Sequence, residues 1–260
     1  MEKKLGFALG AGGSRGVAHI GFLAAMEEAG IRPDYIAGCS MGSVIGAGYA
    51  FGMSVEELKR AVFKLRLLDL IMPSTGRGGF FDTKKIRGLL TKYMGDIQFS
   101  DLKIPFCCVA VDMLSRQIIE FSKGSVADAV IASSSIPSLF RPLEHYGMRL
   151  VDGGVLERVP YKRVRALGAD VVVAVDVLGQ KVCREKCPGT LGILLETIDI
   201  MSYTHTKLLR ERDKKQIDFW LEPELGDMSE YSFKRFEFAC EKGYEIGEKY
   251  AKKIKRKIGK

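Results

Sequence analysis

Several residue types are scarce in this chain of 260 residues, and each scarcity argues against a class of function. Only three histidines are present, His19, His145 and His205, so few side chains are available for a zinc site or a histidine base. The six cysteines are too sparse for a disulfide scaffold in a chain of this length. Cys183 and Cys187 are separated by three residues and have no second ligand pair nearby, so we expect no metal and no cofactor.

Long apolar segments are also lacking. The longest, residues 35–53, is interrupted by serines and glycines, which disfavours a transmembrane span. The opening residues MEKKLGFALGAGG combine a charged start with a short apolar stretch, but no small-x-small cleavage site follows, which disfavours a secretory signal. Adjacent Cys107 and Cys108, in the apolar run IPFCCVAV, fit buried thiols in a reducing compartment. We therefore expect a cytoplasmic protein.

Positive charge is in excess, with a formal net charge of +8, and it is concentrated at the C-terminus. Residues 242–260 contain eight Lys or Arg and two Glu. This segment is either the solvated face of a helix or a surface that is attracted to an anionic membrane, which would place the protein peripherally at the inner face. Nucleic acid is disfavoured as a partner because no recognisable binding module accompanies the segment. The oligomeric state is left open.

Short apolar runs alternate with segments of helical periodicity, which predicts an α/β fold with a mainly parallel sheet, in one domain over residues 1–260. We expect strands at 5–10, 35–39, 104–113, 117–122, 148–154, 169–177 and 217–223. We expect helices at 17–30, 41–52, 54–65, 82–95, 125–137, 190–215 and from about 233 to the C-terminus. The last helix carries the basic segment and would pack on the domain or extend from it.

The segment GCSMG, residues 38–42, matches the pattern G-x-S-x-G, with a predicted strand before it and a predicted helix after it. A nucleophile elbow needs this context, because its serine sits on a strained turn between a strand and a helix. Gly38 and Gly42 would avoid clashes with the adjoining elements, and the helix N-terminus would favour developing negative charge near Ser40. The alternative is that these small residues only allow close packing in the core.

The loop GAGGSRG, residues 10–16, follows a predicted strand and opens a helix, as phosphate-binding loops do. It fails the dinucleotide pattern G-x-G-x-x-G because residue 15 is arginine, and no G-K-[S/T] follows for a P-loop. Nucleotide binding is therefore the weaker interpretation. The stronger one is an oxyanion hole beside the serine, with the amides of Gly12 and Gly13 as donors. Arg15 would order this loop or meet an anionic head group.

A serine nucleophile needs a base, and the histidines are poorly placed for that role. His19 and His205 fall within predicted helices and His145 falls in a polar turn, whereas the base of an α/β-hydrolase triad follows a strand. Asp152 does follow a predicted strand, in LVDGG, and a carboxylate within hydrogen-bond reach can deprotonate a serine directly. The alternatives are an Asp-Gly turn with no catalytic role, or a conventional triad with His205 and Asp176.

Four motifs, GAGGSRGVAHIGFL, GCSMGS, ASSSIPSLFRP and VDGG, resemble in their order and spacing the patatin-like phospholipase family over about residues 5–180. The resemblance implies a three-layer α/β/α fold and hydrolysis of lipid acyl esters, such as phospholipids or lysophospholipids, by a Ser–Asp dyad without a catalytic histidine. By this resemblance, Ser40 is the nucleophile and Asp152 is the base. The resemblance also marks oxyanion-loop residues and motif glycines, namely Gly10, Gly12, Gly13 and Arg15, and Gly38, Gly42, Gly153 and Gly154.

Two departures from the family pattern bear on the site. The loop begins Gly-Ala-Gly-Gly rather than with three consecutive glycines. After VDGG the family commonly has an asparagine-containing stretch, where this chain has VLERVP, so Glu157 and Arg158 alter the expected pocket wall. Residues 66–81 are expected to form a mobile cap over the site or an ordinary packed connection. The alternative to an enzyme is a lipid-binding or regulatory adaptor on the same fold.

Overall fold

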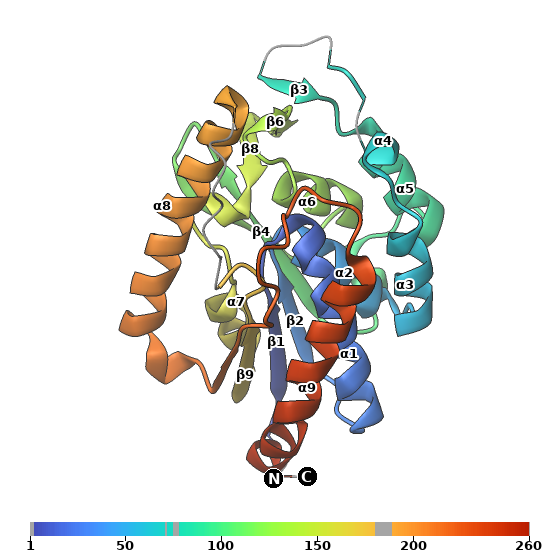
Figure 1. Ribbon diagram of the computed structural model, residues 1–260, viewed down its shortest axis with the longest axis vertical. Coiled ribbons are helices and arrows are strands. Elements are labelled where there is room, and N and C mark those ends of the chain that lie inside the picture. The colour runs from blue at the N-terminus through green and yellow to red at the C-terminus, as the bar shows by residue number, and fades with distance from the viewer. Residues whose placement is uncertain (1–2, 71, 75–77, 180–188, 260) are drawn as a thin grey trace.

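A mixed, mostly parallel sheet forms the centre of the protein (Figure 1). The computed structural model describes residues 3–70, 72–74, 78–179 and 189–259, and within them the strand order is β10-β9-β1-β2-β4-β8-β7, with β5 paired to β4. Its strands are β1 (Leu5–Leu9), β2 (Tyr35–Gly38), β4 (Phe106–Asp112), β5 (Gln117–Phe121), β7 (Leu143–His145), β8 (Met148–Asp152), β9 (Val171–Val175) and β10 (Phe219–Leu221). A separate pair joins β3 (Gly79–Phe81) and β6 (Ser138–Phe140). Strands β10, β9, β1, β2 and β4 run parallel, whereas β5, β7 and β8 pair antiparallel to their neighbours.

The central strands are continuous apolar runs because helices cover both faces of the sheet. Every residue of β1, β4 and β9 is buried. On one face Phe7 and Leu9 pack in the larger core, and on the other Ala8 and Ala37 pack in a smaller core. Alternate residues of one strand therefore serve opposite layers, which confirms the expected three-layer α/β/α architecture.

Helices of very different lengths surround this sheet in the described part of the chain. The longer ones are α1 (Ala18–Glu28), α2 (Met41–Phe51), α3 (Val55–Phe63), α5 (Lys84–Met94), α6 (Val126–Ser133), α8 (Thr190–Arg212) and α9 (Phe236–Ile258). The shorter ones are α4 (Leu67–Leu70), α7 (Tyr161–Ala166) and the 3-10 helices η1 (Gly13–Val17), η2 (Phe99–Asp101), η3 (Gly153–Val155) and η4 (Lys214–Gln216). Helix α3 begins with a capping box, in which Ser54 and Glu57 bond each other's backbone amides.

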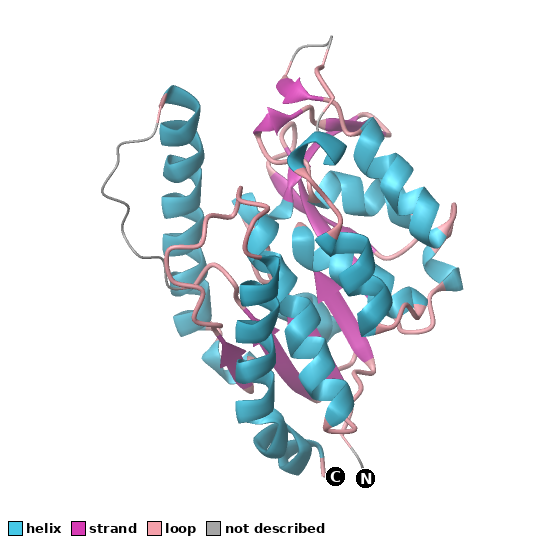
Figure 2. Cartoon of the chain, turned by 45° about the vertical axis from the view of Figure 1, so that its right-hand side comes forward, coloured by secondary structure: helices cyan, strands magenta, loops and turns pink. Residues whose placement is uncertain are grey.

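The chain termini and Ser40 lie at opposite ends of the parallel strands. The amide of Lys3 donates to the carbonyl of Ile258 (3.1 Å), so the chain ends meet beside the start of β1. Figures 1 and 2 place the termini at one end of the molecule and β3 at the other. The glycine loop and Ser40 follow the carboxyl ends of β1 and β2. The basic end of α9 therefore lies near the amino ends of the parallel strands, whereas Ser40 lies at their carboxyl ends.

For the metal site and the membrane span considered from the sequence, the structure bears only on the described residues. Cys183 and Cys187 lie outside the described residues, and the described residues contain no group of three His, Cys, Asp or Glu side chains suited to a metal ion. Among the helices that the structure describes, none is long and apolar enough to cross a membrane. The antiparallel pairing of β8 to β4 was not predicted from the sequence, and it is this pairing that brings Asp152 to the site.

Candidate active site

Ser40 lies on a strained turn between β2 and α2. Its φ of 52° and ψ of −124° place a non-glycine residue in a region that costs about 1–3 kcal/mol. A β-carbon at Gly42 would overlap the Leu9 carbonyl oxygen, so the turn can pass β1 only because residue 42 has no side chain. The amide of Ser40 donates to Oγ of Ser133 at the end of α6 (3.0 Å). The geometry is that of a nucleophile elbow.

Asp152 is the buried carboxylate that faces this serine. It ends β8, opposite Ala110 of β4, and its Oδ1 accepts a hydrogen bond from the Gly154 amide (2.8 Å) and a weak one from the Cys39 thiol (3.8 Å). Burial raises the pKa of Asp152 to about 6, and hydrogen bonding from the side chain of Ser40, from Gly154 and from Cys39 opposes the rise. The carboxylate is thus poised to exchange a proton near neutral pH.

The glycine loop presents amides that have different partners. The Gly10 amide donates to the carbonyl of Val175 (3.0 Å), so it is engaged in the body of the protein. The amides of Gly12 and Gly13 have no partner among the hydrogen bonds of the described residues, and neither does the amide of Met41, directly after the serine. Gly13 has a φ of 50°, and a β-carbon there would overlap the Glu230 carbonyl oxygen. Three free amides therefore lie on the loop and at the helix N-terminus beside Ser40.

Arg15 is buried and points away from this group of amides. Its guanidinium donates to the carbonyls of Val177 (2.7 Å), Gly226 (3.1 Å) and Met228 (2.9 Å). Of the two roles considered for Arg15, ordering the loop fits this geometry, whereas contact with a head group does not. Gly10 likewise supports the loop rather than offering its amide to a ligand.

The segment between α6 and β6 holds the serine and the aspartate together. Ser133 accepts from the Ser40 amide, and the Ser135 carbonyl accepts from the Asp152 amide (2.9 Å). Ser135 in turn donates its hydroxyl to the Ile131 carbonyl (2.8 Å). The serine-rich run that the sequence marked only by resemblance therefore has a physical role in positioning both residues.

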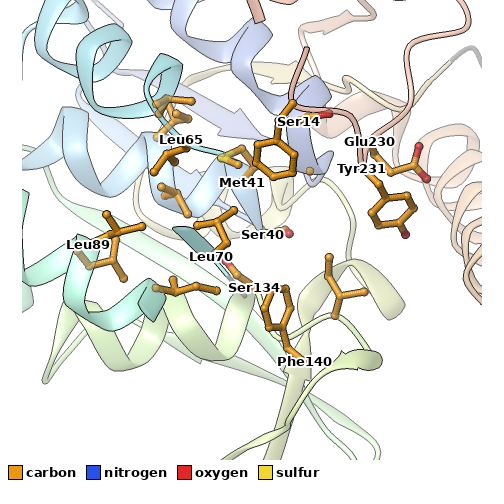
Figure 3. Close-up of a pocket in the computed structure, with 18 of the residues that line it drawn as sticks. Ser14, Ser40, Met41, Leu65, Leu70, Leu89, Ser134, Phe140, Glu230 and Tyr231 are labelled. Atoms are coloured by element: carbon orange, nitrogen blue, oxygen red, sulfur yellow. The ribbon is translucent and has the colours of Figure 1, made fainter. Parts of the chain in front are cut away.

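A large apolar cavity opens at Ser40. It has a volume of about 440 Å³, and residues from α2, α3, α5, the 134–140 segment and α8 line it. Figure 3 shows Ser40 surrounded by side chains that include Met41, Leu70, Leu89 and Phe140. The segment 66–81 contributes Leu70 and Phe81 to this wall, while residues 71 and 75–77 lie outside the described part. Its volume and apolar lining suit a hydrocarbon chain.

A second, smaller cavity of about 80 Å³ also reaches Ser40 and is more polar. Asp152, Arg158 and Ser202 line it. The guanidinium of Arg158 pairs with Asp176 (2.7 Å), with both side chains almost fully buried. Glu157 pairs with Arg163 (2.8 Å). The residues that replace the family's asparagine-containing stretch therefore form ion pairs in and behind one wall of this cavity.

None of the three histidines lines either cavity. Nε2 of buried His19 lies 2.8 Å from the Gly10 carbonyl oxygen, and burial lowers the pKa of His19 to about 4. His145 packs edge-on against Phe121, and His205 lies on α8 without contact with either cavity. The triad of Ser40, His205 and Asp176 is not assembled.

Helix α8 is the part of the site that the sequence did not reveal. Leu191 and Leu195 line the apolar cavity, and Ile198 and Ser202 line the polar one. The hydroxyl of Ser202 donates to the carbonyl of Gly154 (2.6 Å), the same residue whose amide donates to Asp152. These residues recur at helical spacing, which is a signal of an inward face, but nothing in the spacing indicates which cavity that face would line.

Comparison with known proteins agrees with this geometry. Residues 7–164 match the model of the family described as patatin-like phospholipase. An uncharacterized NTE family protein of Mycobacterium tuberculosis is 34% identical over 180 residues, which is 68% of this chain and 50% of that protein. Lysophospholipase NTE1 of Coccidioides immitis is 39% identical over 187 residues, which is 67% of this chain and 12% of that protein. The chain thus spans half or less of the length of these relatives.

Solved structures share the fold at low identity. VipD from Legionella pneumophila superposes with a TM-score of 0.67 at 14% identity, covering 97% of this chain and 67% of that one. ExoU of Pseudomonas aeruginosa, in complex with SpcU, gives 0.51 at 14% identity, covering 100% of this chain and 53% of that one. Since the family model spans more than half of the sequence and the fold agrees, the chain belongs to the patatin-like phospholipase family.

Proposed function

We propose that this protein is a serine acyl hydrolase that cleaves carboxylic esters of lipids through a Ser40–Asp152 dyad and an acyl-enzyme intermediate. The observation that supports this most directly is the strained Ser40 beside a buried carboxylate with a pKa of about 6, at the mouth of an apolar cavity. A binding module gains nothing from that combination, because both the strain and the buried acid cost stability.

In the proposed mechanism, Asp152 takes the hydroxyl proton as Oγ of Ser40 attacks the ester carbonyl carbon. The amides of Gly12, Gly13 and Met41 stabilise the oxyanion, and each such donor contributes about 3–4 kcal/mol in well-studied enzymes. Asp152 then returns the proton to the leaving alcohol as the carbon–oxygen bond breaks. A water molecule, deprotonated by Asp152, attacks the acyl-enzyme, and the carboxylic acid leaves as the proton passes back to Ser40.

The two cavities suggest how a lipid would lie. The acyl chain would occupy the apolar cavity of about 440 Å³, and the alcohol would leave through the polar cavity beside Asp152. The name of the fungal relatives, lysophospholipase, makes a lysophospholipid the first substrate to test. A phospholipid is the second candidate, since the apolar cavity is large enough to admit a hydrocarbon chain of some length.

The test compares Ser40→Ala and Asp152→Asn with the wild-type protein on a short-chain aryl ester and on lysophosphatidylcholine. We expect each variant to lose at least about 1,000-fold in kcat/KM, because both residues act in one unit. His145→Gln and His205→Gln are the matched controls and should keep activity. A fluorophosphonate probe should label Ser40 in the wild-type protein, and folded protein that is neither labelled nor active would favour the adaptor alternative.

We also propose that the basic end of α9 adds electrostatic attraction to anionic membranes. Lys249, Lys252 and Arg256 are exposed on this helix, and each such charge contributes about 1 kcal/mol near an anionic surface. These residues lie near the amino ends of the parallel strands, far from Ser40. They would therefore attract the protein to a membrane without placing Ser40 against its surface.

A further inference from the structure

Helix α8 has two stripes on opposite faces, each made of large apolar residues with Ser or Thr between them. The inner stripe faces the body and consists of Leu195, Ile198, Ser202, Thr206 and Leu209. The outer stripe follows the other face at helical spacing and consists of Ile193, Thr197, Ile200, Met201, Thr204 and Leu208. A surface helix of a soluble domain is normally polar on the face turned away from the core. The outer stripe breaks that rule over about four turns.

The side chains of the outer stripe are well exposed. Ile193 is 50% exposed, Ile200 57%, Met201 67% and Leu208 64%. Of the twelve large hydrophobic side chains that are exposed in the described residues, six lie on α8. Single exposed apolar residues need no explanation, but this concentration on one helix marks an interaction surface.

The apolar surface is continuous with the site. Leu191 and Leu195, on the first turns of the same helix, line the cavity that opens at Ser40. Figure 2 shows α8 along one side of the molecule, with its N-terminal end toward the same end as β3. The first turns of α8 therefore carry both the start of the outer stripe, at Ile193, and part of the lining of the apolar cavity.

Charge is scarce on the first half of α8, and lysines follow on its second half and in η4, directly after it. Residues 190–202 contain only Glu196 and Asp199 as charged groups. Beyond them Lys207, Lys214 and Lys215 are exposed and have no ion pair among the described residues. An apolar stripe that ends in lysines is typical of a helix that lies in the interface of a bilayer.

We propose that the outer stripe of α8 rests on the surface of a lipid bilayer and brings the apolar cavity to its substrate. The proposal relies on the proposed function only in naming a lipid as that substrate. A second copy of the chain is the competing occupant, but a stable protein interface uses about 20–30 residues a side, far more than this stripe provides. A bilayer has no such requirement, because each apolar side chain inserts independently.

The test measures flotation with phosphatidylcholine vesicles, which carry no net charge, at low and at high salt. The variant is Ile200→Gln/Met201→Gln/Leu208→Gln, and the matched control on the same stripe is Thr197→Gln/Thr204→Gln. We expect the triple variant to bind on the order of 100-fold more weakly, at either salt concentration, because three apolar side chains no longer insert. The control should bind as the wild-type protein does. Both should hydrolyse a soluble aryl ester at the wild-type rate, since none of these residues touches the dyad.

The outcomes separate this proposal from the proposed function. Equal vesicle binding by the wild-type protein and the triple variant, or no binding by either, would overturn the docking surface even if hydrolysis depends on Ser40. Loss of vesicle binding in the triple variant would support it, even if Ser40→Ala showed that hydrolysis occurs elsewhere. A wild-type dimer that the triple variant converts to a monomer, with vesicle binding unchanged, would assign the stripe to a second copy instead.

Discussion

Helices α8 and α9 are each 23 residues long, yet they relate to the body of the protein in opposite ways. Helix α9 packs along α1 and buries a stripe at helical spacing, consisting of Phe236, Ala239, Cys240, Gly243, Gly247, Ala251, Ile254 and Ile258. Helix α8 buries only Ser202 and Thr206 and leaves most of its apolar residues in contact with solvent or with the cavities. Figure 1 shows α9 against α1 and α8 standing on the other side of the sheet.

The two helices therefore have different roles: α9 is part of the packed scaffold, and α8 borders the candidate active site. A helix with one apolar face completes a layer of the fold, as α9 does, and its stability comes from packing. A helix with small polar residues at its few buried positions gains little from packing, so α8 contributes little to global stability. The low packing of α8 is consistent with its role beside two cavities, since mobile and ligand-facing elements come from the less stable parts of a structure.

The largest effect expected from this comparison is on stability at the seam between α1 and α9. A β-carbon at Gly243 would overlap the carbonyl oxygen of Ala18, so Gly243→Leu should force the helices apart and cost more than about 3 kcal/mol in the free energy of unfolding. On α8, exposed Thr197→Leu should change it by less than about 0.5 kcal/mol. Urea denaturation measures both. Similar losses in the two variants would show that α8 is as much a part of the scaffold as α9.

The next effect is on the pH dependence of stability, which we assign to Asp152 in the polar cavity that α8 helps to line. The pKa of Asp152 rises from its ordinary value of 3.8 to about 6 in the folded protein, so the folded state holds this proton more tightly than the unfolded state. The free energy of unfolding should therefore fall as pH rises from about 4 to about 6.5, by about 3 kcal/mol relative to Asp152→Asn. The penalty should be absent below pH 4 and constant above pH 7.

Denaturation of wild-type protein and Asp152→Asn across this pH range measures the difference. Lys257→Gln, which removes an ion pair between α9 and Asp218, is the control and should follow the wild-type pH profile. If Asp152 is the base, as proposed, the same titration predicts that kcat/KM rises through pH 6, because that base acts only when ionised. Parallel stability curves for the wild-type protein and Asp152→Asn would contradict the assignment.

A third, smaller effect is expected where α8 contacts Gly154, the residue whose amide holds Asp152. Ser202→Ala removes the hydrogen bond to the carbonyl of Gly154, whose amide holds Asp152, and should lower kcat by up to about tenfold because one such bond contributes up to about 1.5 kcal/mol. As a positioning residue, Ser202 should also affect the pH profile, moving its acidic limb upward as the Gly154 amide loosens. Thr206→Ala, the other buried position of α8, should change neither kcat nor the limb. An unshifted limb in Ser202→Ala would leave it a purely structural role.

How far the sequence could predict this molecule depends on the range of the interactions involved. The elbow at Ser40 was predictable because strand, glycine and helix signals are contiguous, and the placement of Asp152 after a strand was predictable for the same reason. Their approach to each other was not, because it depends on the antiparallel pairing of β8 with β4 and on hydrogen bonds from the 133–135 segment.

The glycine loop and α8 show the same limit. Which loop amides remain free depends on Val175, a residue distant in the sequence that accepts from Gly10. The inward direction of Arg15 depends likewise on carbonyls after residue 176. For α8, periodicity predicted a helix, but two apolar stripes on one helix give no indication of which one meets the body.

The smallest effect is expected from the basic end of α9, and it distinguishes electrostatic attraction from apolar insertion. Lys252→Gln removes one of the three exposed charges, Lys249, Lys252 and Arg256, that face solvent on one side of the helix and each contribute about 1 kcal/mol near an anionic surface. Binding to anionic vesicles at low salt should weaken by about fivefold, and the difference should disappear at high salt because these charges are screened. Binding to phosphatidylcholine vesicles should not change. If this variant instead lost binding to both kinds of vesicle, α9 rather than α8 would form the membrane-contacting surface.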